Sequence, residues 1–275
     1  MQIFSSYTGF DFVAFYLVML ITSIFASIWM PAVLRRDGRP DEPKGMEETA
    51  FLSGGKVRHT TAILTDLFAQ GAFEEEKRGK LRVVRKNFEV GEAGRAVLAE
   101  IGALRFSHFK STLHNYARRV EAQLTERGLL LDQGQRFELR VLSILPYIAL
   151  VVLGLYRVQA GSALGEPTGF LVALLLATAV FALVRFYKFN PRTRAGNEAL
   201  KVLEERSSRL RRAPAASEVG FAVALFGTGV LVGTPWEPVH AMTQLQSGGN
   251  GGSGSNDGGC GGGGCGGGGC GGCGG

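Results

Sequence analysis

No cysteine occurs in the first 259 residues of this chain. Its thiol chemistry is therefore confined to the last sixteen residues, where Cys260, Cys265, Cys270 and Cys273 stand in a tail that is otherwise almost pure glycine. Four cysteines gathered within such a short, biased segment are not expected by chance. We interpret the tail as a separate functional segment that is attached to the rest of the protein.

The body of the chain also lacks the common catalytic motifs. It has no phosphate-binding glycine-rich loop with Lys and Ser or Thr, no zinc-protease helix with paired histidines, and no Gly-x-Ser-x-Gly elbow. His108 and His114 fall on different faces of a helix, and His59 has no obvious carboxylate partner in the sequence. We interpret all three as surface or core histidines, and we expect the protein not to be an enzyme.

Basic residues are missing from the start of the chain, because residues 1–34 contain no Lys or Arg. A cleaved signal peptide, the competing interpretation, needs a basic region before a shorter apolar stretch. Residues 12–34 carry no charged side chain and are long enough as a helix to cross the hydrocarbon core of a bilayer. We expect a first transmembrane helix there, preceded by an extracytoplasmic segment at 1–11.

Two further apolar runs, 141–156 and 168–184, are separated by a short loop that contains Gly and Pro. Each is near the lower length limit for a span, but Arg140, Arg157 and Arg185 can extend from the ends of the runs toward the membrane surface. A buried helix pair in a soluble protein is the alternative, yet neither run has a polar stripe that would face water. The pattern predicts a transmembrane helical hairpin.

The basic residues are concentrated in two segments: 35–140 contains 20 of the 30 Lys and Arg, and 185–218 contains nine more. Basic residues beside membrane spans stay on the cytoplasmic side. We therefore expect a multi-pass protein of the bacterial inner (cell) membrane, with both segments in the cytoplasm and the amino terminus outside. The net charge of +6 then reports topology and is not taken as a sign of nucleic-acid binding.

Segment 35–140 has the pattern of a small α(+β) domain in a protein that is otherwise mainly α. An amphipathic helix that carries Val57 is closed by a glycine, a short hairpin follows at 72–84, and a second amphipathic helix is again closed by a glycine. Helix, glycine stop and β-wing together predict a winged-helix-like cytoplasmic domain. We expect its core to contain Leu64, Phe68, Leu113, Tyr116, Val120 and Leu124.

A winged helix raises DNA binding as a function. The helix that would enter a groove offers only a few suitable side chains, namely Lys56, Arg58, His59, Thr60 and Thr61. The domain also has mixed charge, with 20 basic and 16 acidic residues and no basic stripe. We therefore expect a cytoplasmic protein partner for this domain and no nucleic acid.

Two segments follow the hairpin. Residues 185–218 contain a charged helix with leucines on one side, and we expect this basic cytoplasmic helix to pack on the domain; a helix lying on anionic lipid is the alternative. Residues 219–236 begin with an apolar run that is rich in glycine and would span only about 22 Å as a helix. We expect an interfacial segment there, with a fourth span as the alternative.

Four stretches of the chain stand out as motifs: FLSGGKVRHTTAILTDLFAQGAF at 51–73, LGLYRVQAG before GEPTGFLVALLL, RTRAGNEAL, and VALFGTGVL from Val223. They resemble a family of uncharacterised bacterial membrane proteins, over most of the chain after residue 45. The resemblance implies a membrane protein that ends in a glycine- and cysteine-rich tail, and it brings no established activity. Members commonly carry Arg-Gly-Arg-Pro before the last span of the hairpin, where this chain has Leu-Gly-Glu-Pro at 164–167.

The tail at 247–275 is expected to be disordered, because glycine loses the most backbone entropy on ordering and buries no apolar surface. Four thiolates could close around one ion, since an all-cysteine set suits zinc and thiolates also bind copper(I). Only Cys270 and Cys273 have the two-residue spacing of a zinc knuckle. Disulfides require an extracytoplasmic tail and allow three connectivities, and no cysteine stands in a prenylation box.

Two functions remain open. In the first, the membrane body anchors a tail that binds zinc or copper(I), or that a cysteine-modifying enzyme modifies. In the second, the protein is a membrane-anchored interaction scaffold, and its tail is low-complexity sequence without a function. Neither interpretation assigns catalytic or cofactor-binding residues in the body, and the first assigns the metal ligands to Cys260, Cys265, Cys270 and Cys273.

The charge distribution generates a test of topology. Reporter fusions at Gly38 and at Gly161 are expected to give opposite signals, with Gly38 in the cytoplasm, because 29 of the 30 basic residues then share one side. A phosphatase that is active only outside and a fluorescent protein that matures only inside report the two sides. An extracytoplasmic signal at Gly38 would contradict this topology.

Overall fold

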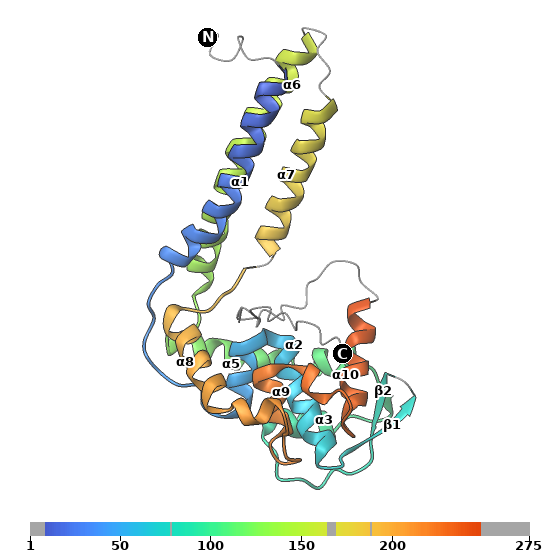
Figure 1. Cartoon of the computed structure of the whole chain (residues 1–275). Coiled ribbons are helices and arrows are strands. Elements are labelled where there is room, and N and C mark those ends of the chain that lie inside the picture. The colour runs from blue at the N-terminus through green and yellow to red at the C-terminus, as the bar shows by residue number, and fades with distance from the viewer. Residues whose placement is uncertain (1–8, 78, 164–168, 188, 249–275) are drawn as a thin grey trace, which may run out of the picture.

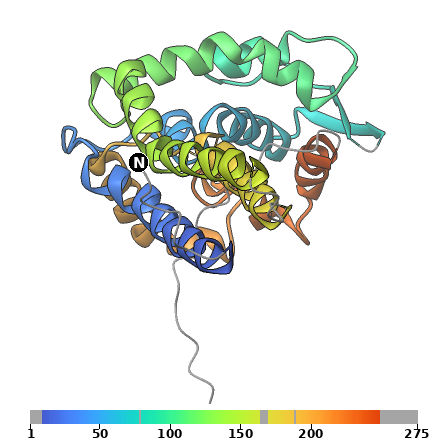
Figure 2. The same cartoon turned by 90° about the horizontal axis from the view of Figure 1, so that it is seen from above.

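The computed structural model describes residues 9–77, 79–163, 169–187 and 189–248. These residues are mostly helical and form two parts, a bundle of three long helices and a compact domain at one end of it (Figure 1). Seen from above, the β-hairpin of the domain lies to one side of the bundle (Figure 2). The bundle consists of α1 (Gly9–Val33), α6 (Gln133–Ala163) and α7 (Gly169–Tyr187).

All three bundle helices are long and apolar enough to cross a membrane, over Phe12–Val33, Gln133–Ala160 and Gly169–Tyr187. They coincide with the helices that the three apolar runs of the sequence predict. The second is longer than its apolar run, 141–156, because α6 begins beside the domain and continues into the bundle as one helix. Many large apolar side chains on the outside of the bundle are exposed, as expected of a surface that faces lipid.

Hydroxyl groups connect the bundle helices from within. The Tyr16 hydroxyl lies 3.1 Å from Thr178 Oγ1, and Ser27 Oγ lies 2.9 Å from the Tyr147 hydroxyl. The Arg185 guanidinium donates to the backbone carbonyl of Ser27 at 3.0 and 2.8 Å. Such bonds stabilise the packing of α1 against α6 and α7, and a hydrocarbon environment would offer these groups no alternative partners.

The domain is built around α2 (Gly45–Ala69), whose residues from His59 to Thr65 are all buried. The predicted hairpin follows it and is confirmed: its strands are antiparallel, and Arg82 Nη2 lies 2.6 Å from Glu76 Oε2. A short third strand pairs with the second. After α2 the elements of this half are β1 (Phe73–Lys77), β2 (Lys80–Val83), α3 (Glu92–Leu98), β3 (Ala103–Leu104), α4 (Phe106–Thr112) and α5 (His114–Glu126).

The chain after the bundle returns to the same domain. The basic segment 185–218 packs on it as predicted, since Leu200 and Leu210 are buried, but it is divided into an α-helix and a 3-10 helix. The next helix packs along α2 (Figure 1). These elements are α8 (Arg194–Arg206), η1 (Ser208–Arg211), α9 (Val219–Phe226), η2 (Thr228–Leu231) and α10 (Glu237–Gly248).

The structure corrects the interfacial segment or fourth span expected at 219–236. Helix α9 has only eight residues, which is too short to span a bilayer, and Val219 and Val223 are fully buried in the core around α2. The sequence pattern misled because a helix covered by protein is as apolar as one covered by lipid. The domain predicted at 35–140 is incomplete for the same reason, since α9 and α10 supply part of its core.

The expected core is mostly correct. Leu64, Leu113, Val120 and Leu124 are buried, whereas Phe68 and Tyr116 are half-buried at its edge. Val57, expected on the same apolar face, is 48% exposed. It lies in the first turn after a break in α2, where the described elements do not cover it.

Substitutions on α2 should distinguish its buried positions from its exposed ones. We expect Leu64→Ala to lower the free energy of unfolding by roughly 2–5 kcal/mol, because it removes packed methyl groups and leaves a cavity. Val57→Ala, on the same helix, should cost less than about 1 kcal/mol because its side chain is largely in solvent. Thermal unfolding of the full-length protein in detergent measures both, and equal losses of stability would contradict the placement of α2.

Candidate functional site

The cysteines predicted as metal ligands, Cys260, Cys265, Cys270 and Cys273, lie outside the described residues. Their arrangement around a metal stays a prediction. Within the described ranges, no group of three or more His, Cys, Asp or Glu side chains is placed to hold a metal ion. The site that the structure does describe lies where the bundle meets the domain.

Helix α2 is broken at Gly54 and Gly55. The backbone of Gly55 has φ 65° and ψ −153°, a conformation that is open to glycine and strained for other residues. The break bends the two halves of α2 toward each other, so that His59 Nε2 lies 3.0 Å from Glu47 Oε2. In a straight helix, residues twelve apart are separated by about 18 Å. The break thus gives His59 the carboxylate partner that the sequence did not indicate.

Arg192 closes the break. The interruption removes the helical partners that the carbonyl groups of Leu52 and Ser53 would otherwise have. The Arg192 Nε donates to the Leu52 carbonyl at 2.6 Å, and its Nη2 donates to the Ser53 carbonyl. A guanidinium fits this role because its fork of donors can serve two acceptors at once. A side chain from the segment after the bundle therefore completes a helix that lies before the bundle.

Backbone hydrogen bonds hold the segment of Arg192 in place. The amide of Leu131 donates to the carbonyl of Pro191 at 2.9 Å, and the amide of Thr193 donates to the carbonyl of Leu129 at 3.1 Å. The two segments therefore run antiparallel, with an isolated β-bridge between them. This pairing fixes the direction in which the arginine side chain leaves the backbone.

Arg192 is buried among charges of both signs. Burial lowers the pKa of Arg192 to about 10; Glu204 partly opposes this effect, and the charges of Arg58 and Arg35 add to it. The side chain is still cationic at neutral pH, because even the lowered pKa lies well above 7. With Glu204 counted, Arg192, Arg58 and Arg35 still leave a net positive charge there, which an additional negative charge would offset.

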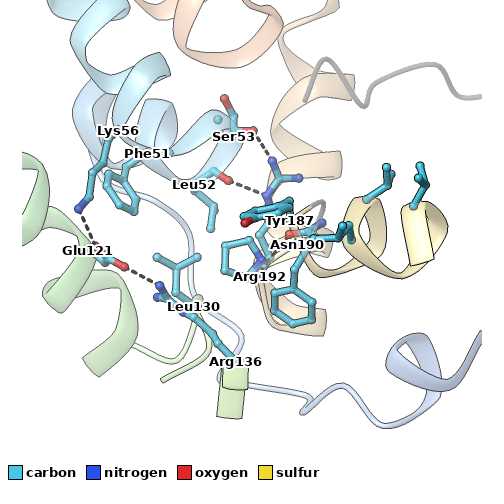
Figure 3. Close-up of a pocket in the computed structure, with 17 residues that line it drawn as sticks. Phe51, Leu52, Ser53, Lys56, Glu121, Leu130, Arg136, Tyr187, Asn190 and Arg192 are labelled. Atoms are coloured by element: carbon cyan, nitrogen blue, oxygen red, sulfur yellow. Dashed lines mark hydrogen bonds and ion pairs between the residues drawn. The ribbon is translucent and has the colours of Figure 1, made fainter. Parts of the chain in front are cut away.

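A cavity of about 790 Å³ opens beside this arginine (Figure 3). Its walls are formed by the break in α2, by the end of α5 and the start of α6, and by the last turns of α7 with the chain that follows them. These walls come from both parts of the molecule. The cavity is therefore a feature of their junction rather than of either part alone.

One side of the cavity is charged. Glu121 lies between two cations, with its Oε1 2.5 Å from Arg136 Nη1 and its Oε2 3.9 Å from Lys56 Nζ (Figure 3). Arg136 also donates through Nε to the carbonyl of Leu131 at 2.6 Å. With Arg192, three cationic side chains and one carboxylate line the cavity. The Lys56 side chain is 38% exposed and is the least engaged of the three cations.

The opposite side of the cavity is apolar. Val180, Leu183, Val184 and Tyr187 of α7 line it, and all four are also exposed at the surface of a helix that is suited to span a membrane. The Ser53 hydroxyl in the lining donates to the Ala224 carbonyl, so it is not placed as a nucleophile beside a base. The arrangement offers groups for binding an amphiphile with a negative charge.

The residues considered for DNA binding have other surroundings. His59, Thr60 and Thr61 are buried, and Lys56 lines the cavity. The Arg58 Nη1 lies 3.4 Å from the Val223 carbonyl, on the side of α9. The structure therefore does not place these five side chains together on an open face of α2, and the expected absence of a nucleic-acid partner stays a prediction.

His108 and His114 are exposed, which agrees with their interpretation as surface residues, and the burial of His59 agrees with a core residue. His108 Nε2 lies 3.0 Å from Glu100 Oε2, and the Thr112 hydroxyl donates to Glu100 Oε1 at 2.7 Å. Hydrogen bonds from His108 and Thr112 lower the pKa of Glu100. His114 does not join this pair, so the histidines form no common site.

Comparisons with protein-family models, with curated proteins and with solved structures found no match for this chain. The class of protein is therefore defined by the fold and the site alone. It is a mostly helical protein with three helices suited to cross a membrane, and with an amphipathic cavity where these helices meet a compact domain.

Sequence reasoning missed the role of Arg192, which it counted only as one of many basic residues near a span. A signal for the break was present, since Gly54-Gly55 interrupts an otherwise helical pattern. No local signal indicates which distant side chain closes that break.

The closure by Arg192 can be tested by substitution. We expect Arg192→Met to destabilise the protein by roughly 2–4 kcal/mol, because it leaves two carbonyl groups near the core without their charged donor. Arg119→Met removes an exposed ion pair with Glu92 and should cost no more than about 1 kcal/mol. Unfolding of the two variants in detergent gives the comparison, and equal stability would show that the break does not depend on Arg192.

Proposed function

We propose that this chain is a multi-pass protein of the bacterial inner membrane that presents its four-cysteine tail on the cytoplasmic side, for binding a thiophilic metal or for modification by a cysteine-directed enzyme. The observation that carries the proposal is the position of α10. This helix packs on the domain and ends at Gly248, so the chain leaves the described structure from the domain.

The side of the tail follows from that position. Val239 and Met242 of α10 are buried in the domain core, and no described helix after α7 is suited to span a membrane. The sequence from 249 to 275 contains no apolar run. The position of α10 therefore supports a tail on the same side as the domain, and the distribution of Lys and Arg favours the cytoplasm for that side.

A cytoplasmic location limits the chemistry that is open to the tail cysteines. Thiols are kept reduced in the cytoplasm, so disulfides between the tail cysteines are disfavoured. Four thiolates suit zinc, and thiolates also select copper(I). The same proposal includes a winged-helix-like domain, which the helix, the hairpin and the third strand support. It also includes the resemblance to a bacterial membrane-protein family.

The tail can be tested on the purified full-length protein. We expect metal analysis to find zinc or copper(I), or intact mass spectrometry to find a modification, in the native protein and not in a variant with all four cysteines changed to serine. The melting temperature of the body should not change, because residues 1–259, which include the described core, contain no cysteine. Gly262→Ser with Gly267→Ser is the matched control, since it alters the spacer and keeps the thiols.

The accessibility of the tail thiols tests the proposed side of the tail separately from its proposed chemistry. Once a chelator has removed bound metal, a membrane-impermeant maleimide should label the tail in inside-out vesicles and not in right-side-out vesicles. Labelling only from outside would overturn the cytoplasmic tail. A native tail that carries free, unmodified thiols and binds no more zinc or copper(I) than the serine variant would favour the alternative, a membrane-anchored interaction scaffold.

A further inference from the structure

The last turns of α7 and the chain that follows them line the cavity beside Arg192 (Figure 3), and Figure 1 shows this end of α7 leaving the bundle toward the domain. Helix α7 is apolar from Gly169 to Val184, a basic residue, Arg185, lies in its last turn, and the following residues 189–192 belong to the lining. The cavity is thus at the depth where a bilayer would give way to water. A ligand in it would touch the lipid-facing surface and the aqueous domain at the same time.

The charged side of the cavity has one cation that is held only by a long ion pair. Arg136 is held by Glu121 and by a backbone carbonyl, and Arg192 is held by two carbonyls. The Lys56 ammonium lies 3.9 Å from Glu121, which is too far for a hydrogen bond. Its donors can therefore bind an anion without breaking a bond that the fold needs.

A further cation adjoins the same cavity. The Arg140 guanidinium carbon lies 5.7 Å from the centre of the Phe186 ring and 5.5 Å from that of Phe189, which is part of the lining. The Arg140 Nε is buried and has no hydrogen-bond partner among the described residues. The excess of positive charge at this junction is thus larger than the lining residues alone contribute.

The size of the cavity and its apolar wall indicate which kind of anion would fit it. About 790 Å³ is within the range of sites that hold small organic ligands and exceeds what a bare phosphate needs. A soluble anion would leave the wall of Val180, Leu183 and Val184 uncovered. An acyl chain along α7 would cover it and would continue into the bilayer that surrounds the helix.

We propose that this cavity binds one anionic phospholipid from the surrounding membrane, with its phosphate beside Lys56 and its chains along the last turns of α7. The bound lipid would compensate the positive charge around the break in α2 and would fill the space between bundle and domain. The proposal does not depend on the tail, and the four-serine variant should bind the lipid as the native protein does.

Lipid titration of the full-length protein tests the charged half of the site. After delipidation in detergent, native mass spectrometry should show tighter binding of phosphatidylglycerol than of phosphatidylcholine. Lys56→Gln should weaken the binding of phosphatidylglycerol about fivefold, the size expected for one cation at a membrane surface. Lys110→Gln is the matched control, because it removes the same charge from an exposed position on α4 that does not line the cavity.

A second pair of variants tests the apolar half. Leu183→Trp places an indole against the apolar side of the cavity, where the acyl chains would lie, and should weaken the binding of phosphatidylglycerol. Leu176→Trp is the control two turns earlier on the same helix; Leu176 is 64% exposed and Leu183 is 56% exposed, and only Leu183 lines the cavity. Both changes place an indole on the lipid-facing surface, so a general effect of tryptophan appears in both.

Two results would overturn the proposal. One is equal binding of the two lipids, with Lys56→Gln indistinguishable from Lys110→Gln and Leu183→Trp indistinguishable from Leu176→Trp. The other is displacement of phosphatidylglycerol by soluble glycerol phosphate at the same concentration, because the site would then recognise a free anion and not a membrane lipid.

Discussion

The break in α2 and its closure by Arg192 determine how the two parts of this molecule fit together. A buried guanidinium loses much of its hydration, and this cost is offset only when its donors find good acceptors. The carbonyl groups of Leu52 and Ser53 are such acceptors because the helix stops pairing them at the glycines. The cavity and the contact between His59 and Glu47 both follow from the same break.

The connections between bundle and domain reinforce this closure. The segments that leave α1 and α7 are hydrogen-bonded to each other: the amide of Arg194 donates to the carbonyl of Arg36 at 3.1 Å, and the amide of Ala195 donates to that of Asp37 at 2.8 Å. Asp37 also pairs with the Arg194 side chain at 3.0 Å. With α6 continuous between the two parts, the domain is joined to the bundle at every chain crossing that the structure describes.

The sequence predicts those features that depend on local composition. Three long apolar runs suffice for three helices, because crossing hydrocarbon requires little beyond length and the absence of charge. The hairpin and much of the core follow from turn residues and helical periodicity. The error at 219–236 arose because local apolarity does not distinguish a protein interior from lipid. The contact of Arg192 with α2 joins residues 140 positions apart, and no pattern in a single sequence marks such a pair.

The division of the domain core between two distant segments has a consequence for biosynthesis. Ser53 of α2 is bonded to Ala224 of α9, and 171 positions of chain separate them, including the two helices of the hairpin. At translation rates of about 5–20 residues per second, α2 exists for roughly ten to thirty seconds before its main packing partner has been made. Helices α6 and α7, both suited to cross a membrane, are made within that interval. The packing of α9 on α2 therefore comes after the synthesis of all three bundle helices.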